Sequence, residues 1–276
     1  KSIMYHYVRD FDPELPFFNS LSKKSFKKQV DLFNKSKILV DEKQFENNLP
    51  EIILTFDDGF KDHIYVAEEL RKKKVIGIFF ISTYPVTENN FLDVHKAHLI
   101  NGKVGGEQAL KALNEYLHKN KILDFIDRDE EKKFKHKYSK NIDKNEKKEF
   151  KKIINYYGNI KLKTKILDDL MVKFKINIKP KEFYMNSDEI KYLSDMGMII
   201  GSHSVNHNLL SRLSEDEQRN EIRNSQELIE DIIKKRCNFF CFPYGGKDSY
   251  NSLTLKILKE FNYNFSFTIQ SKDFDK

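Results

Sequence analysis

The sequence is poor in the residues and patterns that define several protein classes. It has 2 cysteines, which excludes a scaffold held together by several disulfides. With 6 prolines and 10 glycines among 276 residues, it shows no collagen-like or low-complexity bias. No apolar run approaches the roughly 20 residues that a membrane-spanning helix needs. We therefore expect a globular fold without a transmembrane segment.

The residues that are abundant favour a folded core and a charged surface. The 23 phenylalanines and 13 tyrosines are too many for a disordered chain, and 276 residues can bury a sizeable core. The 49 basic and 42 acidic residues leave a net charge of +7. Because the acidic residues are interleaved with the basic ones, we expect a solvated lysine-rich surface and no nucleic-acid partner.

Short apolar runs alternate with helical patterns along the chain. The runs are nearly continuous rather than alternating, which is typical of strands buried on both faces of a parallel sheet; they lie at 3–8, 52–56, 75–81, 198–200, 239–242 and 265–269. Helices are predicted at 61–73, 214–236 and 249–261. The second of them begins with a capping box formed by Ser214 and Glu217. This alternation predicts an α/β fold, either a barrel or an open sheet.

The stretch from about 94 to 180 differs in composition. It is rich in Lys, Glu and Asn, with helical periodicity at 107–119 and 161–174 and a highly charged run at 127–152. We interpret it as a helical insertion carried on a loop of one catalytic domain that spans 1–276. Its lysine clusters indicate either a solvated face or a lid.

The first motif that carries chemistry is TFDDG at 55–59. Two adjacent carboxylates, Asp57 and Asp58, follow an apolar strand, and ligands bind at the carboxyl ends of strands in parallel α/β folds. Adjacent carboxylates repel one another, and a metal ion would compensate for that repulsion. The competing interpretation is an Asp-Asp-Gly turn that caps the next helix.

The second motif is HSVNH at 203–207, which also follows an apolar strand. Its two histidines, His203 and His207, are four residues apart and can face the same way on a helical turn. An Asp with two His is a ligand set that leaves coordination positions open. The pair therefore favours a metal site, although the same spacing also arises by chance.

The third motif is FPYG at 242–245, a proline-aromatic-glycine turn after another strand. Such a turn can aim a backbone N–H at a bound anion, and by itself it is only a turn. Cys241 precedes it in a buried strand and is expected to be a small core residue rather than a ligand. A strand would hold the Cα atoms of Cys237 and Cys241 about 13 Å apart, so we expect no disulfide between them.

In this order, the three motifs resemble those of the polysaccharide deacetylase (NodB-homology) family of metal-dependent carbohydrate esterases. The resemblance covers residues 3–93 and 181–270. It implies a distorted (β/α)7-type barrel and a substrate that is an N-acetylated amino sugar in a glycan or glycan precursor. It also implies that water activated by a divalent metal attacks the amide. The expected metal is zinc.

The resemblance implies a role for each motif. Asp57 would be the general base, and the metal ligands would be Asp58, His203 and His207. The backbone N–H of Tyr244 would contribute to the oxyanion site.

Two departures from the family pattern concern the groups around this chemistry. Many members carry an arginine that steadies the base at the position we align with Phe240. The family's general acid is usually a histidine near the C-terminus. No histidine follows His207 in this sequence, which ends at Lys276. We therefore expect either that the chain is cut short there or that another residue supplies the acid. His98 is the first candidate for the general acid, His6 the second and His95 the third. The competing interpretation of each is a hydrogen-bonded histidine with a structural role.

Other functions and locations remain open at this stage. A sugar-binding protein that keeps the barrel and metal site but is catalytically impaired is the main alternative, and a binder of acidic polymers through the insertion is another. The strand at the start of the chain favours a cytoplasmic enzyme of surface-glycan assembly, whereas a leader removed before Lys1 would make it secreted or periplasmic. The sequence does not indicate which glycan is bound or the oligomeric state.

Overall fold

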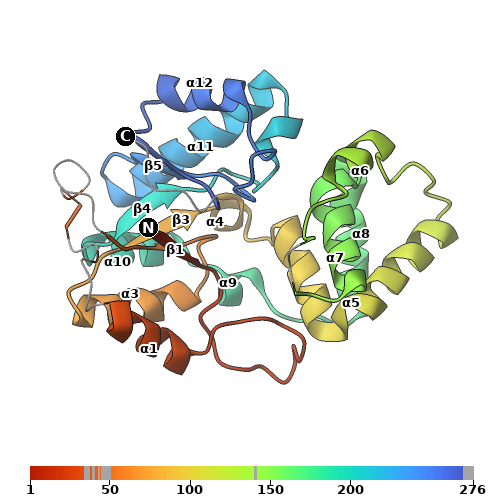
Figure 1. The fold of residues 1–276 in the computed structure, drawn as a ribbon, viewed down its shortest axis with the longest axis horizontal. Helices are drawn as coiled ribbons and strands as arrows, with labels where there is room; N and C mark the ends of the chain where they lie inside the picture. The colour runs from red at the N-terminus through yellow and green to blue at the C-terminus, as the bar shows by residue number, and fades with distance from the viewer. Residues whose placement is uncertain (34–37, 39–40, 43, 45–50, 140–141, 270–276) are drawn as a thin grey trace. The chain divides into compact units, whose positions relative to one another are not determined.

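The computed structural model describes all residues except 34–37, 39–40, 43, 45–50, 140–141 and 270–276 (Figure 1). Its internal contacts divide the chain into two compact units. The first unit comprises 1–10, 20–90 and 179–276, and the second comprises 11–19 and 91–178. The expected insertion at 94–180 overlaps the second unit, and the single-domain organisation stays a prediction. The end of the chain at Lys276 lies outside the described residues.

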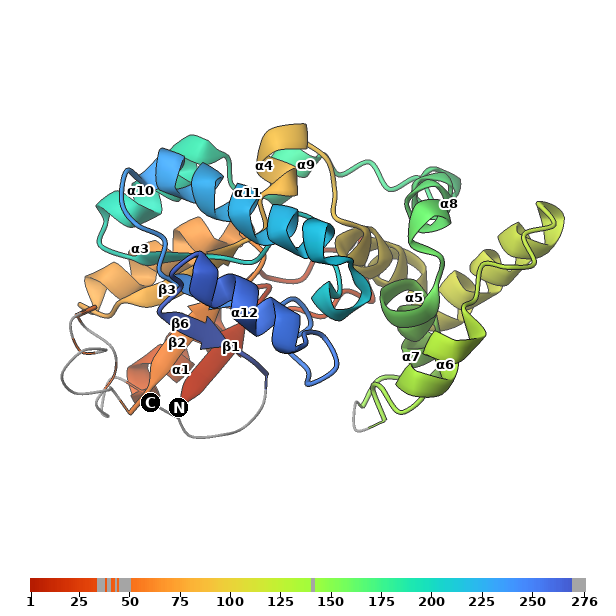
Figure 2. The same ribbon diagram turned by 90° about the horizontal axis from the view of Figure 1, so that it is seen from above.

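A parallel sheet of six strands forms the centre of the first unit (Figures 1 and 2). The strands are hydrogen-bonded in chain order and all neighbours are parallel; they are β1 (Ser2–Tyr5), β2 (Ile53–Phe56), β3 (Gly77–Ile81), β4 (Ile199–Ser202), β5 (Phe239–Cys241) and β6 (Phe265–Phe267). Each overlaps one of the apolar runs of the sequence. The prediction of an α/β barrel-type fold is confirmed, with six strands rather than seven in the described part of the chain.

Both faces of the four central strands, β2 to β5, are buried, as the continuous apolar runs predict. One set of alternating residues, including Leu54, Phe56 and Phe79, packs in a cluster with helix residues. The other set forms the inner cluster of the curled sheet; it is Ile53, Ile78, Phe80, Ile199, Phe239, Cys241 and Phe267. A strand exposes its residues alternately to two faces, so a run without polar residues supplies two cores at once.

Helices cover the outer face of the sheet. The predicted ones are confirmed as α3 (Asp62–Lys72), α11 (Glu215–Ile233) and α12 (Ser252–Glu260). The capping box at the start of α11 is present, with Ser214 Oγ accepting from the Glu217 N–H and the Glu217 carboxylate accepting from the Ser214 N–H. The other helices described in this unit were not predicted from the sequence; they are α1 (Lys23–Phe33), α4 (Tyr84–Glu88), α9 (Pro180–Phe183), α10 (Ser187–Asp195) and the short 3₁₀ turn η2 (Leu210–Arg212).

The second unit is helical. Its elements are α5 (Asp93–Lys119), α6 (Arg128–Phe134), α7 (Asn145–Lys152), the π-helical turn η1 (Ile153–Tyr157) and α8 (Ile160–Lys173). α5 is kinked at Gly105, where φ is +78°, and it packs against α7 and α8. The buried Lys96 of α5 forms an ion pair with Asp168 of α8 (2.6 Å). Among the described residues, no helix has both the length and the apolar character to cross a membrane.

Candidate functional site

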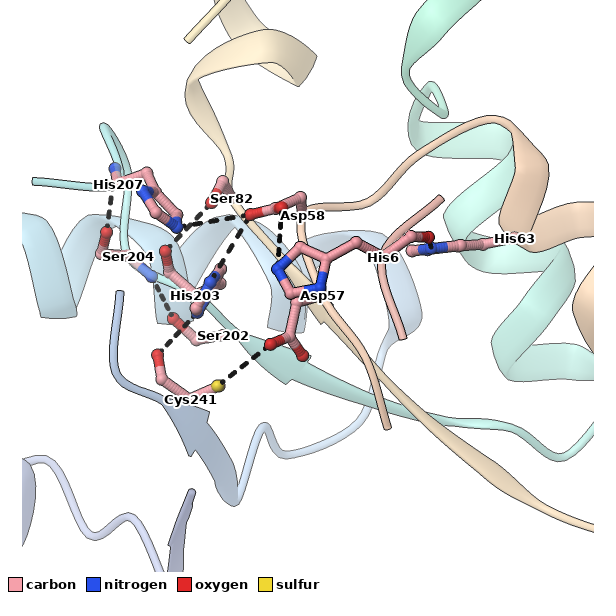
Figure 3. A network of polar contacts seen from close by, with 10 residues as sticks. All are labelled: His6, Asp57, Asp58, His63, Ser82, Ser202, His203, Ser204, His207 and Cys241. Carbon is pink, nitrogen blue, oxygen red and sulfur yellow. Dashed lines mark hydrogen bonds and ion pairs between the residues drawn. The ribbon is translucent and has the colours of Figure 1, made fainter. Parts of the chain in front are cut away.

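The polar residues of the first two motifs meet at one edge of the sheet, beside Cys241, which precedes the third motif (Figure 3). In a parallel sheet all strands end at the same edge, so residues far apart in sequence are brought together there. The residues after β1, β2 and β4 and the last residue of β5 contribute to the cluster; its members are His6, Asp57, Asp58, His203, His207 and Cys241. The ends of four strands therefore supply one buried polar cluster.

Three of these residues have the spacing of a metal-ligand set. Asp58, His203 and His207 are all buried, and Asp58 Oδ1 lies 3.5 Å from His203 Nε2 and 3.4 Å from His207 Nε2. Zinc bonds of roughly 2.0–2.2 Å to N and O require tetrahedral ligands to be about 3.4 Å apart. Both distances from Asp58 match that value and the three ligand atoms lie within 4.8 Å of one another, so the residues fit a divalent cation, which their chemistry does not restrict to zinc.

Hydrogen bonding fixes the orientation of one histidine. His203 Nδ1 donates to the backbone carbonyl of Cys241 (2.7 Å), so Nε2 carries the lone pair that faces Asp58. A metal-binding histidine commonly uses its second ring nitrogen in this way, which sets both tautomer and orientation. Strand β5 thus supports the ligand from β4 directly.

The segment 203–207 is an irregular loop, not the helical turn that the spacing suggested. Ser204 and His207 have positive φ angles of +62° and +55°, which an α-helix does not contain. Ser202 Oγ accepts from the Ser204 N–H (3.3 Å), and Ser204 Oγ accepts from the His207 N–H (3.1 Å). These bonds turn the chain so that both imidazoles face Asp58.

A buried carboxylate from α11 also holds this loop. Glu221 Oε2 accepts from the backbone N–H groups of Val205 (3.0 Å) and Asn206 (2.8 Å), and its Oε1 accepts from the Asn206 side chain (2.6 Å). The sequence analysis did not identify Glu221, because it lies mid-helix and is distant from the motif along the chain. An acidic residue on the apolar face of an amphipathic helix was the only local signal.

The turn after β2 has an unusual backbone conformation. Asp58 has a φ of +80° and the following Gly59 a φ of +71°. Non-glycine residues in this region are strained, and such residues gather at functional sites where the surrounding structure enforces them. Tyr244, in the third motif, also has a positive φ of +62°. Four non-glycine residues around the cluster thus adopt this conformation.

Asp57, the expected base, is buried beside the ligand trio. Only 2% of its surface is exposed, and burial raises its pKa, while the imidazoles of His203 and His6 oppose that rise. Its Oδ2 accepts a hydrogen bond from Cys241 Sγ (3.6 Å). Phe240, where we expected the family's arginine, packs in an apolar cluster with Leu210 and Ile222. The side chain that contacts the base is therefore that of the next residue.

His6 follows β1 and lies at the rim of the cluster. Its Nε2 is 3.7 Å from Asp58 Oδ2, and 35% of its side chain is exposed. The backbone carbonyl of His6 accepts from Nε2 of His63 on α3 (2.9 Å). Burial lowers the pKa of His63 to about 4, so this imidazole is neutral near pH 7 and carries its single proton on Nε2, the nitrogen that faces the carbonyl.

The remaining predicted site residues lie in different parts of the chain. The Tyr244 ring packs edge-on against His207, with centroids 4.8 Å apart, so the third motif borders the ligand trio. His98 lies on α5 in the second unit, where its ring is 5.8 Å from that of His95. Its role as a proton donor stays a prediction.

The cysteines match expectation in part. Both are buried and neither forms a disulfide. Cys241 belongs to the inner core cluster, as expected, but its thiol also reaches the carboxylate of Asp57.

Comparison with known proteins shows which family the sequence matches. The family model for polysaccharide deacetylases matches residues 46–266. YxkH of Bacillus subtilis, which is named as a polysaccharide deacetylase, is 24% identical over 87 residues. That match spans 32% of this chain and 30% of the length of YxkH.

Solved structures share the fold at low sequence identity. The Streptococcus pyogenes deacetylase PplD, solved with acetate, superimposes with a TM-score of 0.56 at 16% identity, covering 95% of this chain and 80% of its own. A de-N-acetylase from Aggregatibacter actinomycetemcomitans gives 0.56 at 13%, covering 98% and 88%. At these identities the likeness concerns the fold alone. Because the family model covers most of the sequence and includes all three motifs, the chain belongs to the polysaccharide deacetylase family of amide hydrolases.

Proposed function

We propose that this chain is a metal-dependent hydrolase that removes the acetyl group from an N-acetylated amino sugar of a glycan or glycan precursor. The observation that carries the proposal is the close spacing of Asp58, His203 and His207 next to the buried carboxylate of Asp57. A binding module would need no second carboxylate beside its metal ligands.

The ligand set suits a divalent cation, and zinc is the expected ion because it combines His and Asp ligands in tetrahedral geometry. When bound, such an ion acidifies water and polarises an amide carbonyl. All three ligands are buried, so they are held in fixed positions and shielded from bulk solvent.

Asp57 is the group that accepts the proton of the attacking water. Its Oδ2 is engaged by Cys241, and within the described chain its Oδ1 has no hydrogen-bond partner although it is buried. That oxygen is therefore available as an acceptor for the water. General base catalysis of this kind contributes typically 10²–10⁴-fold to the rate.

The developing oxyanion and the leaving amine need further groups. The turn at Tyr244 borders His207, so its backbone N–H is the proposed donor to the oxyanion, where a single donor contributes about 3–4 kcal/mol in comparable sites. His6 is the proposed donor to the leaving amine, since its imidazole is partly exposed and lies at 3.7 Å from Asp58. The hydrogen bond from His63 steadies its backbone.

Acetate release from a panel of N-acetylated sugars, with and without added zinc, tests the proposal. We expect metal-dependent release by the wild type, and an Asp57→Asn turnover about 10²–10⁴-fold lower at unchanged metal content. Asn is nearly isosteric with Asp, so the variant removes the base without opening a cavity. Bound metal without acetate release from any substrate would instead favour the sugar-binding alternative.

A further inference from the structure

A second group of potential metal ligands shares His203 with the first. Asp57, His203 and Cys241 each offer a ligand atom, and these atoms lie within 4.8 Å of one another. All three residues are buried. Because this group contains a sulfur and the first contains only nitrogen and oxygen, the two differ in the cations that they prefer.

The Asp57–Cys241 edge already has the length that a metal ion requires. Sγ lies 3.6 Å from Asp57 Oδ2. Tetrahedral bonds of about 2.3 Å to sulfur and about 2.1 Å to oxygen put the two ligands about 3.6 Å apart. A small shift of the His203 ring would complete the trio, because its distances to the other two ligand atoms are at most 4.8 Å.

An independent feature also indicates a ligand at this position. Asp57 is only 2% exposed, yet within the described residues its Oδ1 makes no hydrogen bond. A buried carboxylate oxygen without a partner is costly, and a cation would remove that cost. Cys237, the other buried cysteine, differs here, since its sulfur faces the backbone carbonyls of Ile200 and Phe239.

We propose that Asp57, His203 and Cys241 form a second site that takes a soft, thiophilic divalent cation. On binding, the thiol proton passes to solvent as a metal–sulfur bond forms, so the net reaction exchanges one proton for the ion. Nδ1 of His203 is bonded to the Cys241 carbonyl, which leaves one ring nitrogen for both groups. The soft cation therefore competes with the ion held by Asp58 and His207.

Occupation of this site would inhibit hydrolysis by engaging Asp57. That consequence rests on the proposed function, whereas the site itself does not. A thiophilic ion would act as an inhibitor from inside the catalytic cluster, not as a substitute cofactor.

Cadmium is a suitable probe, because cadmium–thiolate bonds give a charge-transfer absorption in the ultraviolet. The zinc-loaded protein is titrated with Cd²⁺ while absorption and released zinc are recorded. We expect a band that saturates near one equivalent in the wild type, with release of about one equivalent of zinc. Cys237→Ser should behave in the same way, and Cys241→Ser should lack the band.

Two further variants separate the possible outcomes. Asp57→Asn should weaken cadmium binding at least tenfold, and His207→Ala should keep the band because His207 belongs only to the first ligand trio. Circular dichroism checks that each variant is folded, with Cys241→Ala as the second test of the thiol. A full band in Cys241→Ser, its loss in Cys237→Ser, or no band in the wild type would overturn the proposal. A normal band without zinc release would leave the soft site standing and contradict the competition through His203.

Discussion

His63 should make the protein less stable as the pH falls through the range in which free histidine takes up a proton. The imidazole is fully buried, and burial lowers its pKa from 6.5 to about 4. Between these values the unfolded chain binds a proton that the folded chain does not, so stability decreases as pH falls from 6.5 towards 4. Below about pH 4 both states are protonated and the penalty is constant.

The magnitude follows from the two pKa values. Linkage gives a loss of about 2 kcal/mol between about pH 7 and pH 5, reaching about 3 kcal/mol below pH 4. Since the side chain is buried, solvent does not screen this effect. His63→Gln should remove it, because glutamine can still donate to the carbonyl of His6 but does not titrate.

Urea unfolding at the two pH values, with a chelator present so that metal affinity adds no pH dependence, measures the difference. The loss of unfolding free energy from about pH 7 to about pH 5 should be about 2 kcal/mol larger in the wild type than in His63→Gln. The exposed His118 supplies the matched control, since His118→Gln should retain the wild-type dependence. Equal losses in the wild type and in His63→Gln would refute the buried neutral histidine.

Two further predictions concern the proton donor and the helical unit. His6→Ala should lower kcat by about 10²-fold or more with the metal content retained. Steady-state kinetics and metal analysis check this with His98→Ala measured alongside, and a loss of kcat in His98→Ala but not in His6→Ala would assign the proton donor to His98. Gly106→Ala should destabilise the protein by about 1–3 kcal/mol, because the new Cβ would lie 2.5 Å from the Cα and 2.6 Å from the backbone N of Lys147 on α7, and backbone atoms cannot move aside. The exposed Gln108→Ala on the same helix is its control in urea unfolding, and a Gly106→Ala midpoint equal to that of Gln108→Ala would contradict the close packing of α5 on α7.

Much of the fold was predictable because its signals are local. Strands buried on both faces require uninterrupted apolar runs, and such runs occur at all six strands. The start of α11 was predictable from Ser214 and Glu217, since a capping box joins residues only three apart. α10 begins with the same kind of local signal, a capping box of Asn186 and Glu189, so its start was equally predictable from residues three apart.

The residues of the candidate site were predictable from the sequence, but the conformation of its loop was not. Each motif directly follows an apolar strand, and parallel strands end at one edge, so the meeting of Asp58, His203 and His207 could be expected from the order of the chain. The shape of the loop could not, because Ser204 and His207 adopt positive φ angles that Glu221, from a distant helix, helps to enforce.

The sequence by itself determined the fold class, the positions of the strands and the identity of the polar residues at their ends, because these depend on composition and on short-range periodicity. Only the tertiary structure decided that Cys241, rather than Phe240, contacts the base, and that His6 lies beside Asp58. Those contacts join residues more than 50 positions apart, and whether a side chain faces the core or the site changes with a shift of a single residue along a strand.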